Sequence, residues 1–332
     1  MSIRSEKEAR NGLLCAIGAG ATWGIDTVLS GVFMAMSPFV DTATAIVLAP
    51  FVSTFMHDFF SAIWATIYMI FKKQLVNALK AAKTKGGLFI IVGALLGGPI
   101  GMTCYLLSIK YVGAAYTASI TAIFPGISAL LAYLILKEKM NGRVWFGIVL
   151  SVIGVFILGY SPLQAASGNT FILGIVLALG TAFAWSMEGI ICAFSMKYNE
   201  IDSEHAINIR QATSGLFYGL AVIPFIGGYG LVAQTLTSKV GMIIAFTALI
   251  GTISYFQYYK AISIIGAARS TALNITYGVW AIAIQAIFLK VPVSTQLLVG
   301  ALVVLVGSVL VSGSPKELID INEDIVEAEV EA

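Results

Sequence analysis

Residues 12–33, GLLCAIGAGATWGIDTVLSGVF, have a counterpart in residues 174–195, GIVLALGTAFAWSMEGIICAFS. Both stretches are apolar, rich in small residues and long enough for a helix. In each, one acid follows the single Trp by three residues, so indole and carboxylate share a helix face. At an offset of 162 residues, Trp23 aligns with Trp185 and Asp26 aligns with Glu188. The pattern predicts two related halves that begin with the same kind of helix.

The composition indicates a membrane protein. Apolar residues make up 58% of the 332-residue chain and charged residues only 11%, against about 25% charged residues in ordinary globular domains. A helix crosses the hydrocarbon with about 20 apolar residues. We therefore expect an all-α membrane protein with ten transmembrane helices at 12–36, 48–71, 87–110, 113–136, 142–160, 171–196, 204–227, 240–263, 266–289 and 294–313.

The internal repeat continues beyond the first helix, at an offset of 153 residues. The aligned residues are Tyr105 with Tyr258, Gly113-Ala114-Ala115 with Gly266-Ala267-Ala268, Phe124 with Tyr277, Leu136-Lys137 with Leu289-Lys290, Gly147 and Gly154 with Gly300 and Gly307, and His57-Asp58 with Arg210-Gln211. Five helices per half is an odd number, so the second half enters the membrane in the opposite orientation. Inverted repeats of this kind are typical of secondary transporters, whose sites lie between the halves.

The division of the chain follows from this repeat. We expect an N-terminal tail at 1–11, a first five-helix repeat at 12–160, a connecting loop at 161–170, a second repeat at 171–313 and an acidic tail at 314–332. Lysines and arginines concentrate in the N-terminal tail and in the loops 72–85 and 137–143. All three segments fall on one side of a ten-helix arrangement, which predicts that both termini are cytoplasmic.

Several of these features resemble a known family. The paired five-helix repeats, the aromatic–acid pair and the Leu136-Lys137-Glu138 ending of the fourth helix are similar to the drug/metabolite transporter superfamily, EamA type. A narrower resemblance, to bacterial choline permeases of the Lic type, rests on 93–102 (GALLGGPIGM), His57-Asp58-Phe59, Ala184-Trp185 with Glu188, Ile209-Arg210-Gln211, and Asn274 with Tyr277 and Trp280. The resemblance implies choline uptake across the bacterial cytoplasmic membrane, driven by protons or by the membrane potential. Asp26 departs from it, because that group has a small residue there.

Acids inside apolar helices are expensive and therefore functional candidates. Asp26, Asp58 and Glu188 are the candidates for proton coupling or for the counter-ion of a cation. His57, Arg210 and Gln211 are the candidates for polar support. The alternatives remain open: Glu188 can form a structural bridge with Arg210, His57 can simply hydrogen-bond its neighbour, and Asp26 can be a remnant of the symmetry.

Aromatic side chains supply the second part of the predicted site. A quaternary ammonium has no N–H to donate, so proteins hold it against aromatic faces. The candidate substrate-binding residues are Trp23, Tyr105, Trp185, Glu188, Tyr255, Tyr258, Asn274, Tyr277 and Trp280. The alternative is that these rings fill the bundle core or its interfaces.

The sequence thus predicts a secondary transporter that imports choline or a related quaternary amine by alternating access. The first alternative is an exporter of amino acids or metabolites; an intramembrane enzyme and a non-transporting scaffold are more distant ones. No P-loop, HExxH or GxSxG motif occurs, so we expect neither catalysis nor a cofactor or metal. The expected partners are a small cation, protons and the lipid bilayer, with no nucleic acid. The oligomeric state stays open.

Overall fold

The computed structural model describes residues 5–112, 117, 120–121, 123–159 and 169–312. Every regular element in these ranges is a helix. The acidic tail at 314–332, nearly all of the 161–170 loop and the predicted repeat residues 113–115 lie outside them. The part of the chain that is described therefore shows an all-helical protein, as the sequence predicts.

The first half contains α1 (Glu6–Met34), α2 (Ala43–Phe71), α3 (Leu75–Ala82), α4 (Lys85–Leu95), the π-helical turn η1 (Leu96–Ile100), α5 (Gly101–Val112), α7 (Phe124–Ile135) and α8 (Gly142–Gly159). The second contains α9 (Asn169–Tyr198), α10 (Ser203–Phe217), the π-helical turn η2 (Tyr218–Val222), α11 (Ile223–Phe225), α12 (Tyr229–Leu236), α13 (Lys239–Ile265), α14 (Ala267–Asn274), α15 (Tyr277–Phe288) and α16 (Thr295–Ser312).

Seven helical segments of the described chain are long and apolar enough to cross a membrane: Glu6–Met34, Ala43–Phe71, Lys85–Val112, Phe171–Tyr198, Lys239–Ile265, Ala267–Phe288 and Thr295–Ser312. Phe124–Ile135 and Gly142–Leu158 are shorter apolar helices. The prediction of ten spans is therefore met only in part. The stretch predicted at 204–227 differs because α10 carries polar residues on its buried face and ends in η2.

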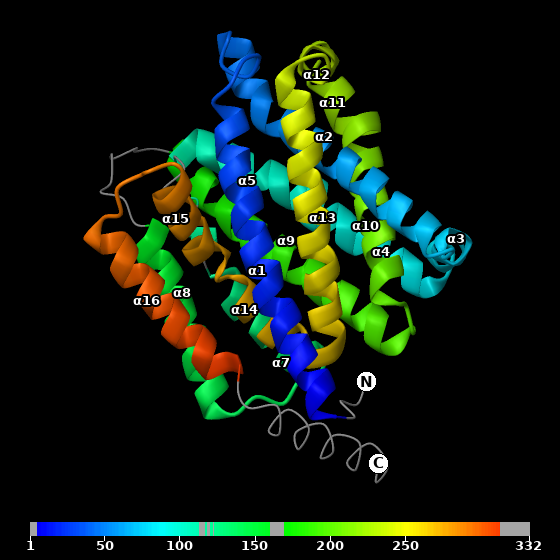
Figure 1. The fold of residues 1–332 in the computed structure, drawn as a ribbon, viewed down its shortest axis with the longest axis vertical. Coiled ribbons are helices and arrows are strands. Elements are labelled where there is room, and N and C mark those ends of the chain that lie inside the picture. The colour runs from blue at the N-terminus through cyan, green and yellow to red at the C-terminus, as the bar shows by residue number, and fades with distance from the viewer. Residues whose placement is uncertain (1–4, 113–116, 118–119, 122, 160–168, 313–332) are drawn as a thin grey trace.

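Glycines bring α8 and α16 together, and these helices lie side by side in Figure 1. A Cβ added to Gly147 would meet the Gly307 carbonyl at 2.7 Å, and one added to Gly154 would meet the Gly300 carbonyl at 3.0 Å. The sequence repeat aligns Gly147 with Gly300 and Gly154 with Gly307. The contacts are thus reciprocal, the arrangement that a two-fold axis produces.

Two spans are interrupted in their interiors. Pro99 lacks an N–H and lies in η1, where the Gly101 amide bonds to the carbonyls of Leu96 and Gly98. The second interruption separates α14 from α15 at residues 275–276. α7 begins at Phe124, the residue that the repeat aligns with Tyr277 at the start of α15. Interrupted helices are common at the binding sites of transporters, because they free backbone groups there.

A contact between the halves caps α14. The Glu138 carboxylate, in the turn after α7, accepts hydrogen bonds from the amides of Ala267 at 2.6 Å and Ala268 at 3.1 Å. Lys137 and Lys290 both have a φ of 55°, so the two turns share a conformation. Val291 takes the place of Glu138 in the second turn, which therefore has no carboxylate at this position.

We expect Glu138→Gln to lower the melting temperature of the detergent-solubilised protein by a few degrees. The amide offers one accepting oxygen in place of two, and one buried N–H loses its partner at a cost of about 1–3 kcal/mol. Differential scanning fluorimetry measures the change. The exposed Glu200 provides the matched control, Glu200→Gln. Equal melting temperatures for both variants would contradict a stabilising role for the cap.

Candidate functional site

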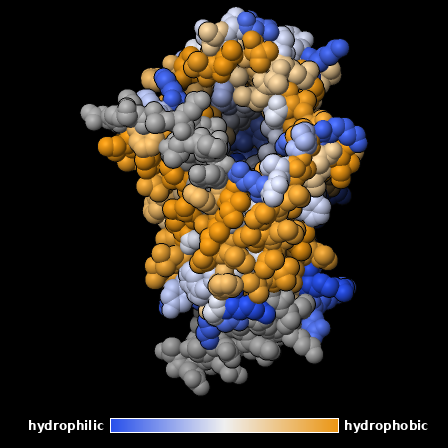
Figure 2. Space-filling view, turned by 90° about the vertical axis from the view of Figure 1, so that its left-hand side faces the viewer, coloured by the Kyte–Doolittle hydropathy of each residue, from blue (hydrophilic) through white to orange (hydrophobic). Residues whose placement is uncertain are grey.

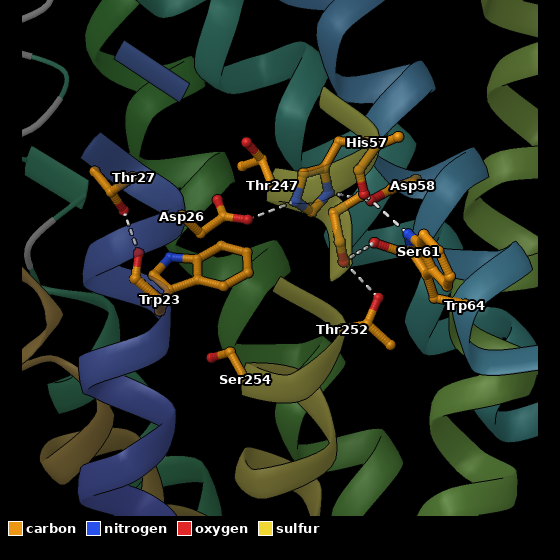
Figure 3. A network of polar contacts seen from close by, with 12 residues as sticks. Trp23, Asp26, Thr27, His57, Asp58, Ser61, Trp64, Thr247, Thr252 and Ser254 are labelled. Atoms are coloured by element: carbon orange, nitrogen blue, oxygen red, sulfur yellow. Dashed lines mark hydrogen bonds and ion pairs between the residues drawn. The ribbon is translucent and has the colours of Figure 1, made fainter. Parts of the chain in front are cut away.

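His57 on α2 lies between two carboxylates (Figure 3). Its Nε2 is 2.7 Å from Oδ2 of Asp26 on α1, and its Nδ1 is 3.6 Å from Oδ1 of Asp58 on α2. The Ser214 hydroxyl of α10 donates to the other Asp58 oxygen at 2.5 Å. Asp26 and Asp58 are each only 5% exposed. The four side chains form a compact buried unit that links three helices.

Arg210 on α10 extends this unit to α9. Its Nε donates to Oε1 of Glu188 at 2.7 Å, and its Nη1 donates to Oε1 of Gln211 at 2.6 Å. The same Nη1 is 3.8 Å from Oδ1 of Asp58. Its guanidinium carbon lies 4.7 Å from the centre of the Tyr255 ring on α13. All of the predicted charged and polar-support residues therefore belong to one cluster.

The two shortest ion pairs of the cluster correspond to each other in the repeat. Asp26 aligns with Glu188, and His57 aligns with Arg210. In each half, the acid on the first helix is 2.7 Å from a base on the second helix. The bases differ, because imidazole can release its proton at physiological pH whereas guanidinium cannot.

Aromatic rings lie on both sides of the cluster. Trp23 meets Tyr255 edge to face with ring centres 5.1 Å apart, and the ring of His57 is 6.3 Å from that of Trp23. On the other side, Trp185 lies 5.4 Å from Tyr105. Phe124, at the start of α7, meets Trp185 edge to face at 6.0 Å. Of the predicted rings, Trp23, Tyr255, Trp185 and Tyr105 thus gather around the charged residues.

The π-helical turn η1 positions Trp185. Because the Gly101 amide bonds elsewhere, the Gly97 carbonyl accepts the indole N–H of Trp185 at 3.1 Å. Gly97 also lies directly against Glu188, and a Cβ at this position would overlap the carboxylate. A Cβ at Gly101 would lie 3.1 Å from the Trp185 ring. These glycines let α9 approach η1 and the start of α5 closely enough to place the side chains of Trp185 and Glu188.

Gly97→Ala should displace Glu188 from Arg210 and lower the melting temperature by several degrees, since overpacking costs about 1–3 kcal/mol. Gly180→Ala is the matched control on α9, where a Cβ meets no atom within 4 Å. Scanning fluorimetry of both variants measures the difference. A Gly97→Ala variant as stable as the control would contradict this packing.

The remaining predicted residues lie at the interrupted helix and on α13. Tyr258 shares a hydrogen bond of 2.7 Å with Thr271 of α14. Tyr277 lies near Tyr105. Asn274 Oδ1 is buried without a hydrogen-bond partner among the described residues. Trp280 differs from this group because it is 41% exposed and its Cβ lies against Gly24 of α1.

Figure 2 shows a hollow in the upper half of one face, with hydrophilic residues inside and hydrophobic residues over much of the surface below it. The start of α1 and the end of α16 lie at the opposite, lower end (Figure 1). Within the described residues, no group of three or more His, Cys, Asp or Glu side chains is arranged to hold a metal ion. The side chains described above offer charge, hydrogen bonding and aromatic surface.

Sequence reasoning missed two residues that contribute to the site, Ser214 and Gly251. Ser214 follows Arg210 by four residues and thus shares its helix face, a signal that the sequence does contain. Gly251 on α13 makes room for the Asp26–His57 pair, since a Cβ there would lie 2.6 Å from Asp26 and 2.8 Å from His57. Arg269 of α14 is only 6% exposed, because α14 packs inside the bundle.

Comparison with known proteins identifies the family. The profile of the EamA-like transporter family matches residues 10–160 and again residues 172–313. The chain belongs to the EamA-like transporter family. The resemblance inferred from the sequence is thus confirmed, and the protein is a multi-pass membrane transporter of that family.

Two relatives of this EamA-like protein extend the comparison. Protein LicB of Haemophilus influenzae is 34% identical over 219 residues, which cover 66% of this chain and 73% of that protein. An uncharacterised transporter of Clostridium kluyveri is 23% identical over 258 residues, 77% of this chain and 81% of that protein. A solved crystal structure matches with a TM-score of 0.63 at 15% identity, covering 92% of this chain and 97% of the other, which shows a shared fold.

Proposed function

We propose that this EamA-like transporter imports choline or a closely related quaternary ammonium compound. The observation that supports this proposal most strongly is the buried cluster of Asp26, Asp58 and Glu188 beside the rings of Trp23 and Trp185. Among the described residues, the basic side chains paired with these three carboxylates are His57 and Arg210. A permanent cation that cannot donate a hydrogen bond needs this combination of aromatic faces and compensating negative charge.

Two further observations support the hydroxylated substrate. The unpartnered Asn274 Oδ1 is an acceptor at the interrupted helix, suited to the hydroxyl group of choline. Buried acceptors without partners cost about 1–3 kcal/mol, which a donating ligand recovers. The likeness to protein LicB is in keeping with a substrate of this class.

The proposed cycle is alternating access between two inverted halves. The hollow lies at the end opposite the start of α1 and the end of α16 (Figures 1 and 2), so cytoplasmic termini would make this the outward-facing state. The Glu138 cap of α14 would then help to close the cytoplasmic side. A cation entering this site is drawn inward by a membrane potential that is negative inside, worth about 2.3 kcal/mol per charge at 100 mV.

An exporter of amino acids would need a free cation to hold the carboxylate. Arg210 is already engaged by Glu188, Gln211 and the Tyr255 face, which disfavours this alternative. Betaine distinguishes the two functions, because it combines the quaternary ammonium of choline with a carboxylate that the acidic cluster repels.

Uptake into proteoliposomes tests the proposal. Labelled choline should accumulate when a potassium diffusion potential makes the inside negative, and unlabelled choline should compete far better than betaine, ethanolamine or a mixture of amino acids. Empty liposomes give the background. Absence of choline accumulation, or competition by amino acids as strong as by choline, would overturn the proposal.

A further inference from the structure

The buried cluster contains one basic group that can gain and lose a proton, and its surroundings fix what that proton does. Both ring nitrogens of His57 face carboxylate oxygens, Nε2 toward Asp26 at 2.7 Å and Nδ1 toward Asp58 at 3.6 Å. A neutral imidazole has a single N–H, so one nitrogen would present its lone pair to a carboxylate. The arrangement therefore fits the imidazolium, which donates to Asp26 and places its positive charge beside Asp58 as well.

Charged and titratable groups from several helices interact with His57 or with one of the two carboxylates beside it. They are Asp26 of α1, Asp58 of α2, Glu188 of α9, Arg210 of α10, Tyr218 of η2 and Tyr255 of α13. Arg210 keeps its charge under all physiological conditions. The repeat relates two ion pairs, Asp26–His57 and Glu188–Arg210. Loss of a proton removes the positive charge of the first pair, whereas the second pair keeps its positive charge.

Counting charges shows what one proton would accomplish. With His57 protonated, three carboxylates face two cations, which leaves one net negative charge. One bound choline then brings the cluster to neutrality. With His57 neutral, the same cluster carries two net negative charges, and choline leaves it charged. Because moving an uncompensated charge through a low-dielectric interior is costly, the neutral combination is the one that favours a conformational change.

We propose that His57 binds a proton that is co-transported with the quaternary ammonium. The transporter then changes from its outward-facing to its inward-facing state with both the proton and the substrate bound. This inference rests on the proposed function for its substrate, and it names the group that couples the substrate to the proton gradient. Asp26 is the positioning residue that holds Nε2, and the space above Gly251 accommodates the pair. The side chain of His57 is 12% exposed, which limits its exchange with water to a state in which a path is open.

The test uses full-length protein in proteoliposomes clamped at zero membrane potential. An acidic exterior should raise the initial rate of choline uptake several-fold over symmetric pH. In His57→Gln and in the fixed-charge variant His57→Lys, the ratio of the two rates should fall to about one. His205 is the other histidine of the chain, and His205→Gln is the control that should keep the full ratio. A His57→Gln or His57→Lys protein whose uptake still responds to the pH gradient would overturn the inference.

A second measurement is independent of choline. Imidazolium quenches indole fluorescence, and the Trp23 ring lies 6.3 Å from that of His57. Wild type and His205→Gln in detergent should show a pH-dependent step in tryptophan emission that His57→Gln and His57→Lys lack. If wild type showed this step but did not take up choline, the substrate assignment would fail while the proton site would stand. If all four proteins showed the same step, the assignment of the proton site to His57 would be wrong.

Discussion

Glu188→Gln should reduce choline uptake into proteoliposomes by about tenfold or more while the protein stays folded. The amide keeps the size of the side chain but removes one of the three carboxylates that balance Arg210, His57 and the substrate. Each 1.4 kcal/mol lost from cation binding lowers affinity tenfold, and a desolvated carboxylate near a cation contributes at least this much.

The matched control is Glu200→Gln, because Glu200 is exposed and lies outside the cluster. Initial uptake rates at several choline concentrations separate weaker binding from slower transport. Size-exclusion chromatography shows whether the variant is still monodisperse. Full uptake by Glu188→Gln would remove Glu188 from the site and would leave its pair with Arg210 as a purely structural bridge, the alternative that the sequence leaves open.

The second large effect concerns stability. Arg210→Met should destabilise the protein by about 3–5 kcal/mol, because removing one partner of a buried ion pair leaves an uncompensated charge. Arg210 is 4% exposed and supports Glu188, Asp58 and Gln211 together. Lys260→Met is the control, since Lys260 also lies on a membrane helix but is exposed. Melting temperatures in detergent should fall sharply for the first variant and little for the second.

A double variant separates the ion pair from general packing. If the cost of Arg210→Met comes from stranded carboxylates, adding Glu188→Gln should recover part of the lost melting temperature. Coupling of this kind is expected only for residues in direct contact. Additive losses in the double variant would show that Arg210 stabilises the fold through packing alone.

The sequence predicts which residues belong to the cluster better than it predicts which of them pair with each other. Three acids in apolar helices are visible because such residues are rare there, and all three are found together. The pairing of Asp26 with His57 depends on how closely α1 and α2 approach beside Gly251. No periodicity reports that distance, so the sequence left Asp26 as a possible symmetry remnant. The structure gives it a partner.

The parts of the fold that could be predicted are the helices that correspond to long apolar stretches of the sequence. The apolar helices of the described residues overlap predicted spans, but the shape of the interrupted segments depends on local hydrogen bonding. Pro99 predicts a lost backbone bond, whereas only the structure shows that the freed carbonyl belongs to Gly97 and holds Trp185. Likewise, α10 fails the hydropathy expectation because its buried face carries Arg210 and Gln211.

The central claim is that the acidic cluster and its aromatic rings form a binding site for a quaternary ammonium. A thermal-shift panel on the purified protein, with choline, tetramethylammonium, polyamines and amino acids, tests it without any gradient. A ligand that binds only the folded protein adds about 2.7 kcal/mol of stability at one hundred times its Kd. The account predicts a concentration-dependent rise in melting temperature with choline and a smaller one with tetramethylammonium, which lacks the hydroxyl group. A rise with amino acids and none with choline would contradict it.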